Sequence, residues 1–233
     1  MALTAGCKQG YKIGVSFNEQ PFNQPGKAKN TMPKVGMEQI RREQVISATR
    51  RCIVEKGVLE LSIKDVAAEA GVSTGVIYHY FKNKQDILLQ VLKETFRKSN
   101  DQVMQTMAPL DSSKDKLFAH LENITFVPMD NPDFFLLLIN YFAQAQNNQE
   151  CADIIKKFYR NLRSFISQYL QQGVETDELD PELTEQLPVI LLALGLGLGM
   201  MQTLDPDSFD MAKMESALKK ICENALDPNG RNQ

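Results

Sequence analysis

The chain of 233 residues is poor in the residue types on which many enzymes and metalloproteins depend, because it has two histidines, four cysteines and no tryptophan. Neither His79 nor His120 belongs to a nucleophile or metal motif, and no Walker loop occurs. The cysteines lie far apart without a CxxC pair, so the sequence predicts neither a disulfide framework nor a zinc site. Cys52 and Cys222 fall in apolar periodic stretches and are predicted to be small core residues. We therefore expect no enzymatic activity, no cofactor or metal, and a reducing cytoplasm as the location.

Long apolar runs and strand patterns are also missing. The longest apolar run, 187–201, has 15 residues and contains Pro188 and three glycines. A membrane-spanning helix needs about 20 apolar residues, so this run predicts a helix buried on most sides and no membrane span. The first residues lack the continuous apolar stretch of a secretory signal. Strand patterns are absent and apolar residues recur at helical spacing, which predicts an all-α fold.

The net charge of -3 conceals an uneven distribution. Residues 34–98 carry 12 Lys and Arg against 8 Asp and Glu, a net of +4, while the rest of the chain carries 14 against 21, a net of -7. A basic head on an acidic body suits a protein whose head meets phosphate. Scatter among surface charges explains the same numbers equally well, so charge alone leaves both interpretations open.

The sequence divides into four predicted segments. Residues 1–31 are polar and lack periodicity, which predicts a disordered leader. Met32-Pro33-Lys34 precedes the first helical pattern, and we hypothesise that translation starts at Met32, which the intact mass of protein made from its own promoter would test. The predicted segments are a leader over 1–33, a helix-turn-helix domain over 34–82, a helical ligand-binding and dimerisation domain over 83–227, and a flexible tail over 228–233.

Helical periodicity and end signals locate the helices. Gly57 is predicted to end the first helix as a left-handed cap. Ser62 and Asp65 resemble a capping box, and Ser73 is a good N-cap. Asn131-Pro132 predicts a further helix start, Gly173 a helix end, and the acidic stretch 175–180 a solvated loop. The predicted helices span 37–56, 63–70, 74–81, 83 or 84 to 99, 112–127, 131–147, 149–173, 181–204 and 208–226.

Two short helices joined by Gly71-Val72 have the sequence form of a helix-turn-helix. The major groove of DNA is wide enough for one helix, and the second helix of such a pair enters it. Ile77 and Phe81, four residues apart, are predicted to face inward and anchor that helix. The residues predicted to face outward are Thr74, Gly75, Tyr78 and His79.

The outward residues suit contacts with a duplex. Tyr78 and Tyr80 carry hydroxyls for phosphate oxygens, while Thr74 and His79 suit base edges. Lys84, at the start of the next helix, is placed to clamp a phosphate. His79 and Lys84 also fit plain solvated positions, and Tyr80 fits a core aromatic with its hydroxyl at the rim. The predicted DNA-binding set is Arg41, Arg42, Ser62, Ser73, Thr74, Gly75, Tyr78, His79, Tyr80 and Lys84.

Gly75 is unusual because an exposed helical glycine costs up to about 1 kcal/mol relative to alanine. Close approach to a nucleic-acid backbone or base edge would explain why glycine is tolerated there. The alternative is a glycine that occupies an unimportant position by chance.

The segment 71–84, Gly-Val-Ser-Thr-Gly-Val-Ile-Tyr-His-Tyr-Phe-Lys-Asn-Lys, resembles the signature of the TetR/AcrR repressors. The supporting positions Gly57, Ser62, Ile63, Val66, Ala67 and Ile87-Leu88 also fit, whereas Ile53 stands where the family often has an aromatic residue. The resemblance covers about residues 37–98, and 32–42 with the head are similar to the choline-responsive BetI branch. It implies a three-helix DNA-binding head, a fourth helix linking the head to a ligand-binding body, and homodimers on a palindromic operator.

The body offers two candidate sites. An aromatic cavity for a small molecule is one interpretation of its dense apolar segments, and plain core packing is the other. The residues predicted to line that cavity are Phe134, Leu138, Tyr141, Phe142, Tyr159 and Phe165. The resemblance implies that the last two helices pair with their symmetry mates, and the residues predicted for this interface are Leu191, Leu194, Gly195, Leu198, Gly199, Met214 and Leu218.

These observations predict a ligand-responsive regulator that binds a double-stranded DNA operator as a homodimer and is released by a small-molecule effector. A repressor fits this arrangement best. The alternative is a helical adaptor whose helix-turn-helix contacts protein. The similarity cannot be traced beyond Lys98, so the sequence does not identify the effector.

Overall fold

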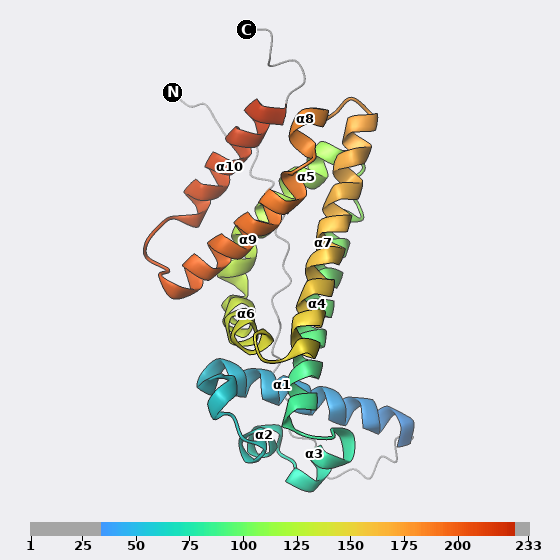
Figure 1. Cartoon of the computed structure of the whole chain (residues 1–233), viewed down its shortest axis with the longest axis vertical. Coiled ribbons are helices and arrows are strands. Elements are labelled where there is room, and N and C mark those ends of the chain that lie inside the picture. Colours follow the sequence, from blue (N-terminus) through green and yellow to red (C-terminus); the bar gives the residue numbers. More distant parts are fainter. Residues whose placement is uncertain (1–33, 227–233) are drawn as a thin grey trace, which may run out of the picture. The chain divides into compact units, whose positions relative to one another are not determined.

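The computed structural model describes residues 34–226, so the predicted leader, the proposed start at Met32 and the tail lie outside the described residues. Every element within this range is a helix and no strand occurs there, which confirms the all-α prediction (Figure 1). The helices are α1 (Lys34–Glu60), α2 (Ile63–Ala70), α3 (Thr74–Tyr80), α4 (Lys84–Met107), α5 (Ser113–Asp130), α6 (Pro132–Ala145), α7 (Gln149–Glu175), α8 (Pro181–Thr184), α9 (Leu187–Leu204) and α10 (Met211–Leu226).

The short helices α2 and α3 begin where their caps predict. The Ser62 hydroxyl accepts the backbone N–H of Asp65, and the Asp65 carboxylate accepts the backbone N–H of Ser62, so the capping box is complete. The Ser73 hydroxyl accepts the backbone N–H of Val76 and caps α3. Gly71 ends α2 in the left-handed conformation, with φ 63° and ψ 35°, which glycine adopts without steric cost.

Gly57 interrupts the first helix where the sequence predicts its end, but not as a left-handed cap. Its φ of 76° is positive, its ψ of 162° is extended, and a second helical stretch, included in α1, continues to Glu60. The backbone N–H of Val58, just after this kink, donates to Asn140 Oδ1 of α6 at 3.1 Å. The kink therefore brings the end of α1 onto α6.

The predicted helix 181–204 is two helices, α8 and α9. Pro188 lies in the first turn of α9, where its missing N–H costs nothing, whereas within a continuous helix it would remove a hydrogen bond and clash with the preceding turn. The Asp180 carboxylate caps α8 by accepting the backbone N–H of Glu182 at 2.9 Å.

Gly173 lies inside α7 and does not end it. A Cβ at this position would lie 2.7 Å from both Leu179 and Ser113, so glycine permits a close approach.

The acidic stretch after α7 is not simply a solvated loop, because Glu178 accepts hydrogen bonds from the Ser112 hydroxyl at 2.8 Å and from the Lys114 N–H at 3.2 Å at the start of α5. These hydrogen bonds, the Ser112 hydroxyl foremost, hold the pKa of Glu178 below its usual value.

One hydrophobic cluster joins the N-terminal helices to the body. Its buried side chains come from α1 to α4, from α6 and from α7, and include Ile53, Ile77, Phe81, Leu92 and Leu138. Cys52, at 3% exposure, belongs to it as predicted. A second cluster packs α5, α7 and α9 together, with Cys222 of α10 half-buried beside it. The helix α4 is the element that passes from α3 into the body (Figure 1).

The helix α9 is less buried within the subunit than its composition predicts. By length and composition α9 could cross a membrane, but core helices of soluble proteins meet the same two criteria. Only 22% of α9 is buried within the subunit, because the neighbouring helices α5, α6 and α7 leave the rest of its surface uncovered. Gly199 lies on the covered side, where an added Cβ would lie 2.0 Å from the Phe135 ring of α6.

We predict that Gly199→Ala lowers the free energy of unfolding by about 1–2 kcal/mol. Overpacking costs about 1–3 kcal/mol, and the better helix propensity of alanine returns about 1 kcal/mol at most. The control is Gly75→Ala on α3, where the nearest atom to an added Cβ, the Ser73 hydroxyl oxygen, lies 3.7 Å away. Urea unfolding of both variants measures the difference, and a Gly199→Ala protein as stable as the control would contradict the packing of α9 on α6.

Candidate DNA-binding interface

The helix α3 presents a polar face and buries the opposite one. Ile77 is fully buried and Phe81, its C-cap, is 2% exposed. Tyr78 is 55% exposed on the other side. The remaining exposed residues are those predicted to face outward, namely Thr74, Gly75 and His79. The seven residues of α3 therefore divide into anchors and a solvent face as the spacing predicts.

Arg42 holds α3 in place from α1. Its guanidinium donates to the backbone carbonyl of Tyr80 at 2.9 Å and lies 4.9 Å from the centre of the Phe81 ring. A cation over an aromatic face is attracted by the ring quadrupole. Predicted to contact DNA, Arg42 is instead placed to position the helix that does so.

The other arginines of α1 have protein partners. Arg41 donates to Gln44 at 2.9 Å. Arg51 pairs with Glu69 of α2 at 2.6 Å, and Arg50 with Asp133 of α6 at 3.3 Å. The two ion pairs join α1 to α2 and α6, and they neutralise part of the positive charge counted from the sequence.

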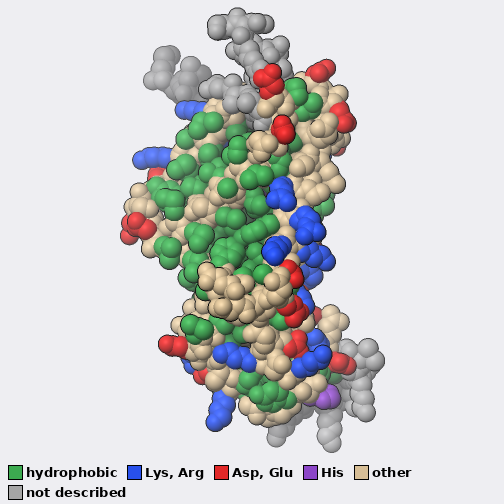
Figure 2. All heavy atoms as spheres, viewed as in Figure 1, with side chains coloured by type: hydrophobic (Ala, Val, Ile, Leu, Met, Phe, Trp, Pro, Cys, Tyr) green, Lys and Arg blue, Asp and Glu red, His purple; other side chains and the backbone are tan. Residues whose placement is uncertain are grey.

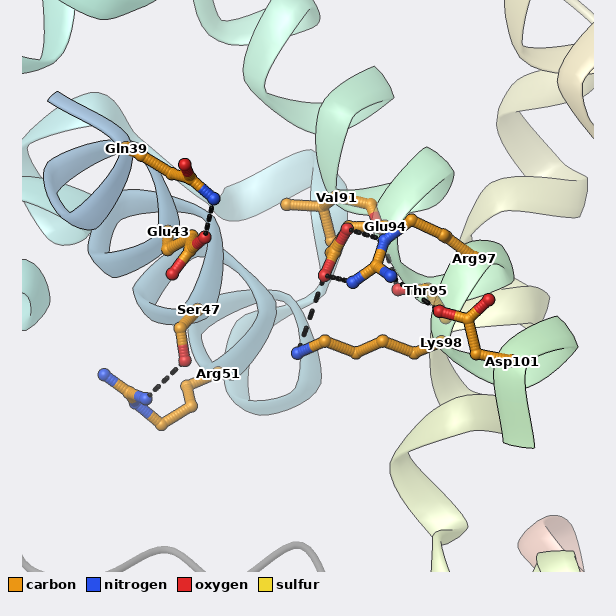
Figure 3. Close-up of polar contacts among 10 residues, drawn as sticks. All are labelled: Gln39, Glu43, Ser47, Arg51, Val91, Glu94, Thr95, Arg97, Lys98 and Asp101. Carbon is orange, nitrogen blue, oxygen red and sulfur yellow. Dashed lines mark hydrogen bonds and ion pairs between the residues drawn. The ribbon is translucent and has the colours of Figure 1, made fainter. Parts of the chain in front are cut away.

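A polar network on α4 neutralises more of that charge (Figure 3). Arg97 pairs with Glu94 at 2.7 Å and with Asp101 at 2.6 Å, and Lys98 lies 3.8 Å from Glu94. Hydrogen bonding from Arg97 lowers the pKa of Glu94, so this carboxylate stays ionised. This face of α4 is consequently not a concentrated positive surface.

Ser62 and Ser73, both predicted to contact DNA, use their hydroxyls as helix caps. Asp65 also accepts the Lys56 ammonium at 2.7 Å. Lys56 and then Ser62 lower the pKa of Asp65 well below its usual range, so the capping carboxylate stays ionised at neutral pH. The helix-turn-helix is therefore fixed at both N-termini by side chains from its own sequence.

Tyr80 and Lys84 lie at the exit from α3. The Tyr80 ring is half-buried against the hydrophobic cluster that joins the N-terminal helices to the body, and its centre lies 4.8 Å from the centre of the His79 ring in an edge-on arrangement. This favours the core-aromatic interpretation. Lys84 is half-buried in the first turn of α4, which Asn83 caps by accepting the Asp86 N–H at 2.8 Å. Sequence reasoning overlooked Lys82, which is exposed between the two helices. Lys82 lies within the segment 71–84 that resembles the TetR/AcrR signature, and this position could have identified it as a candidate DNA contact.

Gly75 has room for a side chain. Apart from the Ser73 hydroxyl oxygen at 3.7 Å, no described atom outside its immediate surroundings lies within 4 Å of an added Cβ. Packing within the subunit therefore does not require glycine. Glycine at this position is therefore explained either by a partner outside the subunit, such as DNA, or by chance.

Of the six predicted cavity residues, only Phe165 lines the cavity of the described residues at the end of α4. Phe134, Leu138 and Tyr141 are buried in the shared core, where the Tyr141 hydroxyl donates to the Leu88 carbonyl at 2.6 Å. Phe142 and Tyr159 are half-buried beside the same core. Phe165 lines a cavity of about 250 Å³ at the other end of α4. Its other lining residues are Met104, Met107, Ala108, Leu110, Lys116, Gln168, Tyr169 and Gln172.

Most of the residues predicted for the subunit interface are used inside the subunit. Leu191, Leu198 and Gly199 are buried, and a Cβ added at Gly195 would lie 3.3 Å from the Ile124 side chain. Leu194, Met214 and Leu218 are half-buried against the second cluster. The face that α9 exposes consists of other residues: Val189, Ile190, Ala193, Gly197, Met201 and Leu204.

Two family models match the chain. The model of bacterial regulatory proteins of the tetR family matches residues 45–91, which contain α2 and α3. The model of the C-terminal part of BetI-type transcriptional repressors matches residues 113–227. The second match finds the relationship beyond Lys98 that the resemblance could not trace.

Curated relatives agree with both models. The HTH-type transcriptional regulator BetI of Agrobacterium fabrum is 27% identical over 189 residues, which cover 77% of this chain and 91% of the relative. The protein of the same name from Cronobacter sakazakii is 41% identical over 93 residues, which cover 39% of this chain and 46% of the relative. The higher identity thus belongs to a shorter segment.

Solved structures share the fold at low sequence identity. A transcriptional regulator from Saccharomonospora viridis in complex with choline has a TM-score of 0.73 at 20% identity, covering 81% of this chain and 98% of that one. The regulator FadR from Bacillus subtilis in complex with stearoyl-CoA has a TM-score of 0.65 at 20% identity, covering 77% and 96%. Nothing in these comparisons supports the adaptor alternative. The chain belongs to the TetR family of bacterial transcriptional regulators, and its body is of the BetI type.

Proposed function

We propose that the protein is a homodimeric repressor that binds a palindromic operator through α3 and is released when a small molecule enters its body. The observation that carries this proposal is the division of α3 into two buried anchors, Ile77 and Phe81, and an exposed polar face. That division suits a helix lying in the major groove with its outer side chains against the bases.

The exposed face supplies two kinds of DNA contact. Tyr78, with its ring half in solvent, offers a hydroxyl to phosphate oxygens. Thr74 and His79 are placed for base edges, and Lys82 and Lys84 add positive charge at the exit from α3. Phosphate contacts position the head and base contacts select the sequence.

The exposed apolar face of α9 is our proposed dimer interface. Figure 2 shows hydrophobic side chains gathered over α9. Exposures of 54% at Ile190 and 70% at Leu204 are unusual for large side chains of one helix, and a contiguous exposed apolar patch marks an interaction site. Ile221 of α10, at 62%, is also exposed. This face replaces Leu191, Leu198 and Gly199 as the candidate contact.

An effector acting through α4 would couple the body to the head. α4 lines the cavity with Met104 and Met107 near its end, and its first turns share a core with Ile77 and Phe81. Operator half-sites lie about one helical turn, ~34 Å, or a multiple of it apart, so a small splay of two heads opposes simultaneous docking. The ligand complexes of the two structural neighbours support a ligand within such a body.

Tyr78→Phe and His79→Ala should separate affinity from specificity. Loss of the Tyr78 hydroxyl should weaken binding to operator and random DNA alike, because phosphate contacts carry no sequence information. His79→Ala should lower operator affinity by about 1–3 kcal/mol with little change on random DNA. Gel shifts at several salt concentrations measure both. Equal losses on the two DNAs for both variants would contradict the assigned roles.

Gly75→Ala should lower operator affinity while leaving stability unchanged or raising it by up to about 1 kcal/mol. The subunit has room for the added methyl group, so only an approaching duplex would meet it. Quantitative gel shifts and urea unfolding on the same preparation give the two readouts. Unchanged operator affinity would show that Gly75 is at that position by chance.

Ile190→Glu combined with Met201→Glu should convert the dimer to a monomer, because two carboxylates would enter an apolar interface. Sedimentation velocity should show half the mass, and operator affinity should fall with it. Leu59→Glu is the control, since Leu59 is 92% exposed and lies on α1. A dimer that survives the double substitution would exclude this face of α9.

A further inference from the structure

A buried tyrosine hydroxyl without a partner belongs to one of the residues that line the cavity beside the end of α4. Tyr169 lines this cavity, is 3% exposed, and its hydroxyl has no hydrogen-bond partner among the described residues. Burial raises the pKa of Tyr169, so the hydroxyl remains protonated and able to donate. A buried donor left unpaired is costly, and a ligand that accepts from it would remove that cost.

The charge of the cavity wall is of one sign. Lys116 of α5 is the only charged side chain among the described residues that line it, and no carboxylate is among them. Its ammonium lies 3.5 Å from the Asp111 carbonyl, at the outer limit of a hydrogen bond. A ligand anion would therefore find a cation at this wall, and a ligand cation would find no partner of opposite charge.

The rest of the wall is apolar except for the amides of Gln168 and Gln172, and the space is small. Met104 and Met107 of α4 and Phe165 of α7 line it, and the Phe165 and Tyr169 rings lie 5.8 Å apart. A volume of about 250 Å³ lies below the range of roughly 300–1,000 Å³ that drug-sized ligands occupy. The cavity therefore has room for a short apolar tail.

We propose that the effector is a small carboxylate with a short apolar tail. Its carboxylate accepts hydrogen bonds from the Lys116 ammonium and the Tyr169 hydroxyl, and its tail packs against Met104, Met107 and Phe165. This inference rests on the proposed function, in which the body binds an effector. It sets this protein apart from its structural neighbour in complex with choline, a cation.

A cationic ligand is the main alternative, because the faces of Phe165 and Tyr169 attract positive charge. Lys116 opposes that attraction, and no carboxylate among the described lining residues compensates it. The net preference of this wall is therefore for an anion. The two chemistries differ in the sign of one charge, which makes them separable with matched probes.

The test uses the full-length protein and three probes of similar length: hexanoate, hexanamide and hexylammonium. Titration calorimetry should show saturable binding of hexanoate, weaker binding of hexanamide and the weakest binding of hexylammonium. Lys116→Gln should lower hexanoate affinity about tenfold or more, as expected for loss of a charged hydrogen bond, and abolish the preference over hexanamide. Lys114→Gln, an exposed lysine two residues earlier on α5, is the matched control and should bind as the parent does.

Tyr169→Phe tests the hydroxyl separately. Without ligand this variant should be as stable as the parent or more so, because the unpaired donor is gone. With hexanoate its affinity should fall. Hexylammonium binding as tightly as hexanoate, unchanged affinity in Lys116→Gln, or failure of hexanoate to bind would each overturn the proposal. Gel shifts on the same preparation distinguish these failures from failure of the proposed function, since operator binding persists if only the ligand class is wrong.

Discussion

The burial of Ile77 and Phe81 in a core shared with α4 and the body is the constraint on which the molecule depends. A seven-residue helix is not stable alone, since isolated helices below about 12–15 residues are marginal in water. The orientation of α3 is therefore set by these two side chains and by Arg42, which holds the Tyr80 carbonyl and the Phe81 ring. Because the same core includes Leu138 of α6 and Ile155 of α7, the DNA-reading face cannot move independently of the body.

The helix α6 provides a second connection between head and body. At one contact Asn140 accepts the Val58 N–H, and its own amide donates to the Leu136 carbonyl at 2.9 Å, which fixes its orientation. At another, Phe135 packs against Gly199 of α9 so closely that a methyl group does not fit. The exposed face of α9 is our proposed dimer contact, so in that proposal α6 would connect the dimer interface to α1 through packed side chains. Densely packed interiors transmit displacement in this way.

The sequence predicts best what is decided locally. The caps at Ser62 and Ser73 and the inward side of α3 depend on neighbouring residues alone, and all are confirmed. Gly173 was misplaced because it is required by packing against Ser113, which is distant in the sequence, as well as against Leu179. The faces of α9 could not be assigned, since a helix apolar all round carries no periodic signal to separate Leu191, which is buried, from Ile190, which is exposed. Of the residues that line the cavity, only Phe165 was predicted, because residues such as Lys116 come to the same wall only through packing.

The net charge of the head overstates its attraction for DNA. Among the basic residues of 34–98, Arg51, Lys56 and Arg97 each pair with a carboxylate. Lys82 and Lys84 lie beside α3, where in the proposed complex positive charge would act directly on phosphate. Because the salt dependence of binding counts the phosphates neutralised by lysine and arginine, a head of this kind should depend on few ionic contacts per subunit. Neutral donors such as the Tyr78 hydroxyl then carry a larger share of the backbone contacts, and two heads acting together on one duplex become necessary for tight binding.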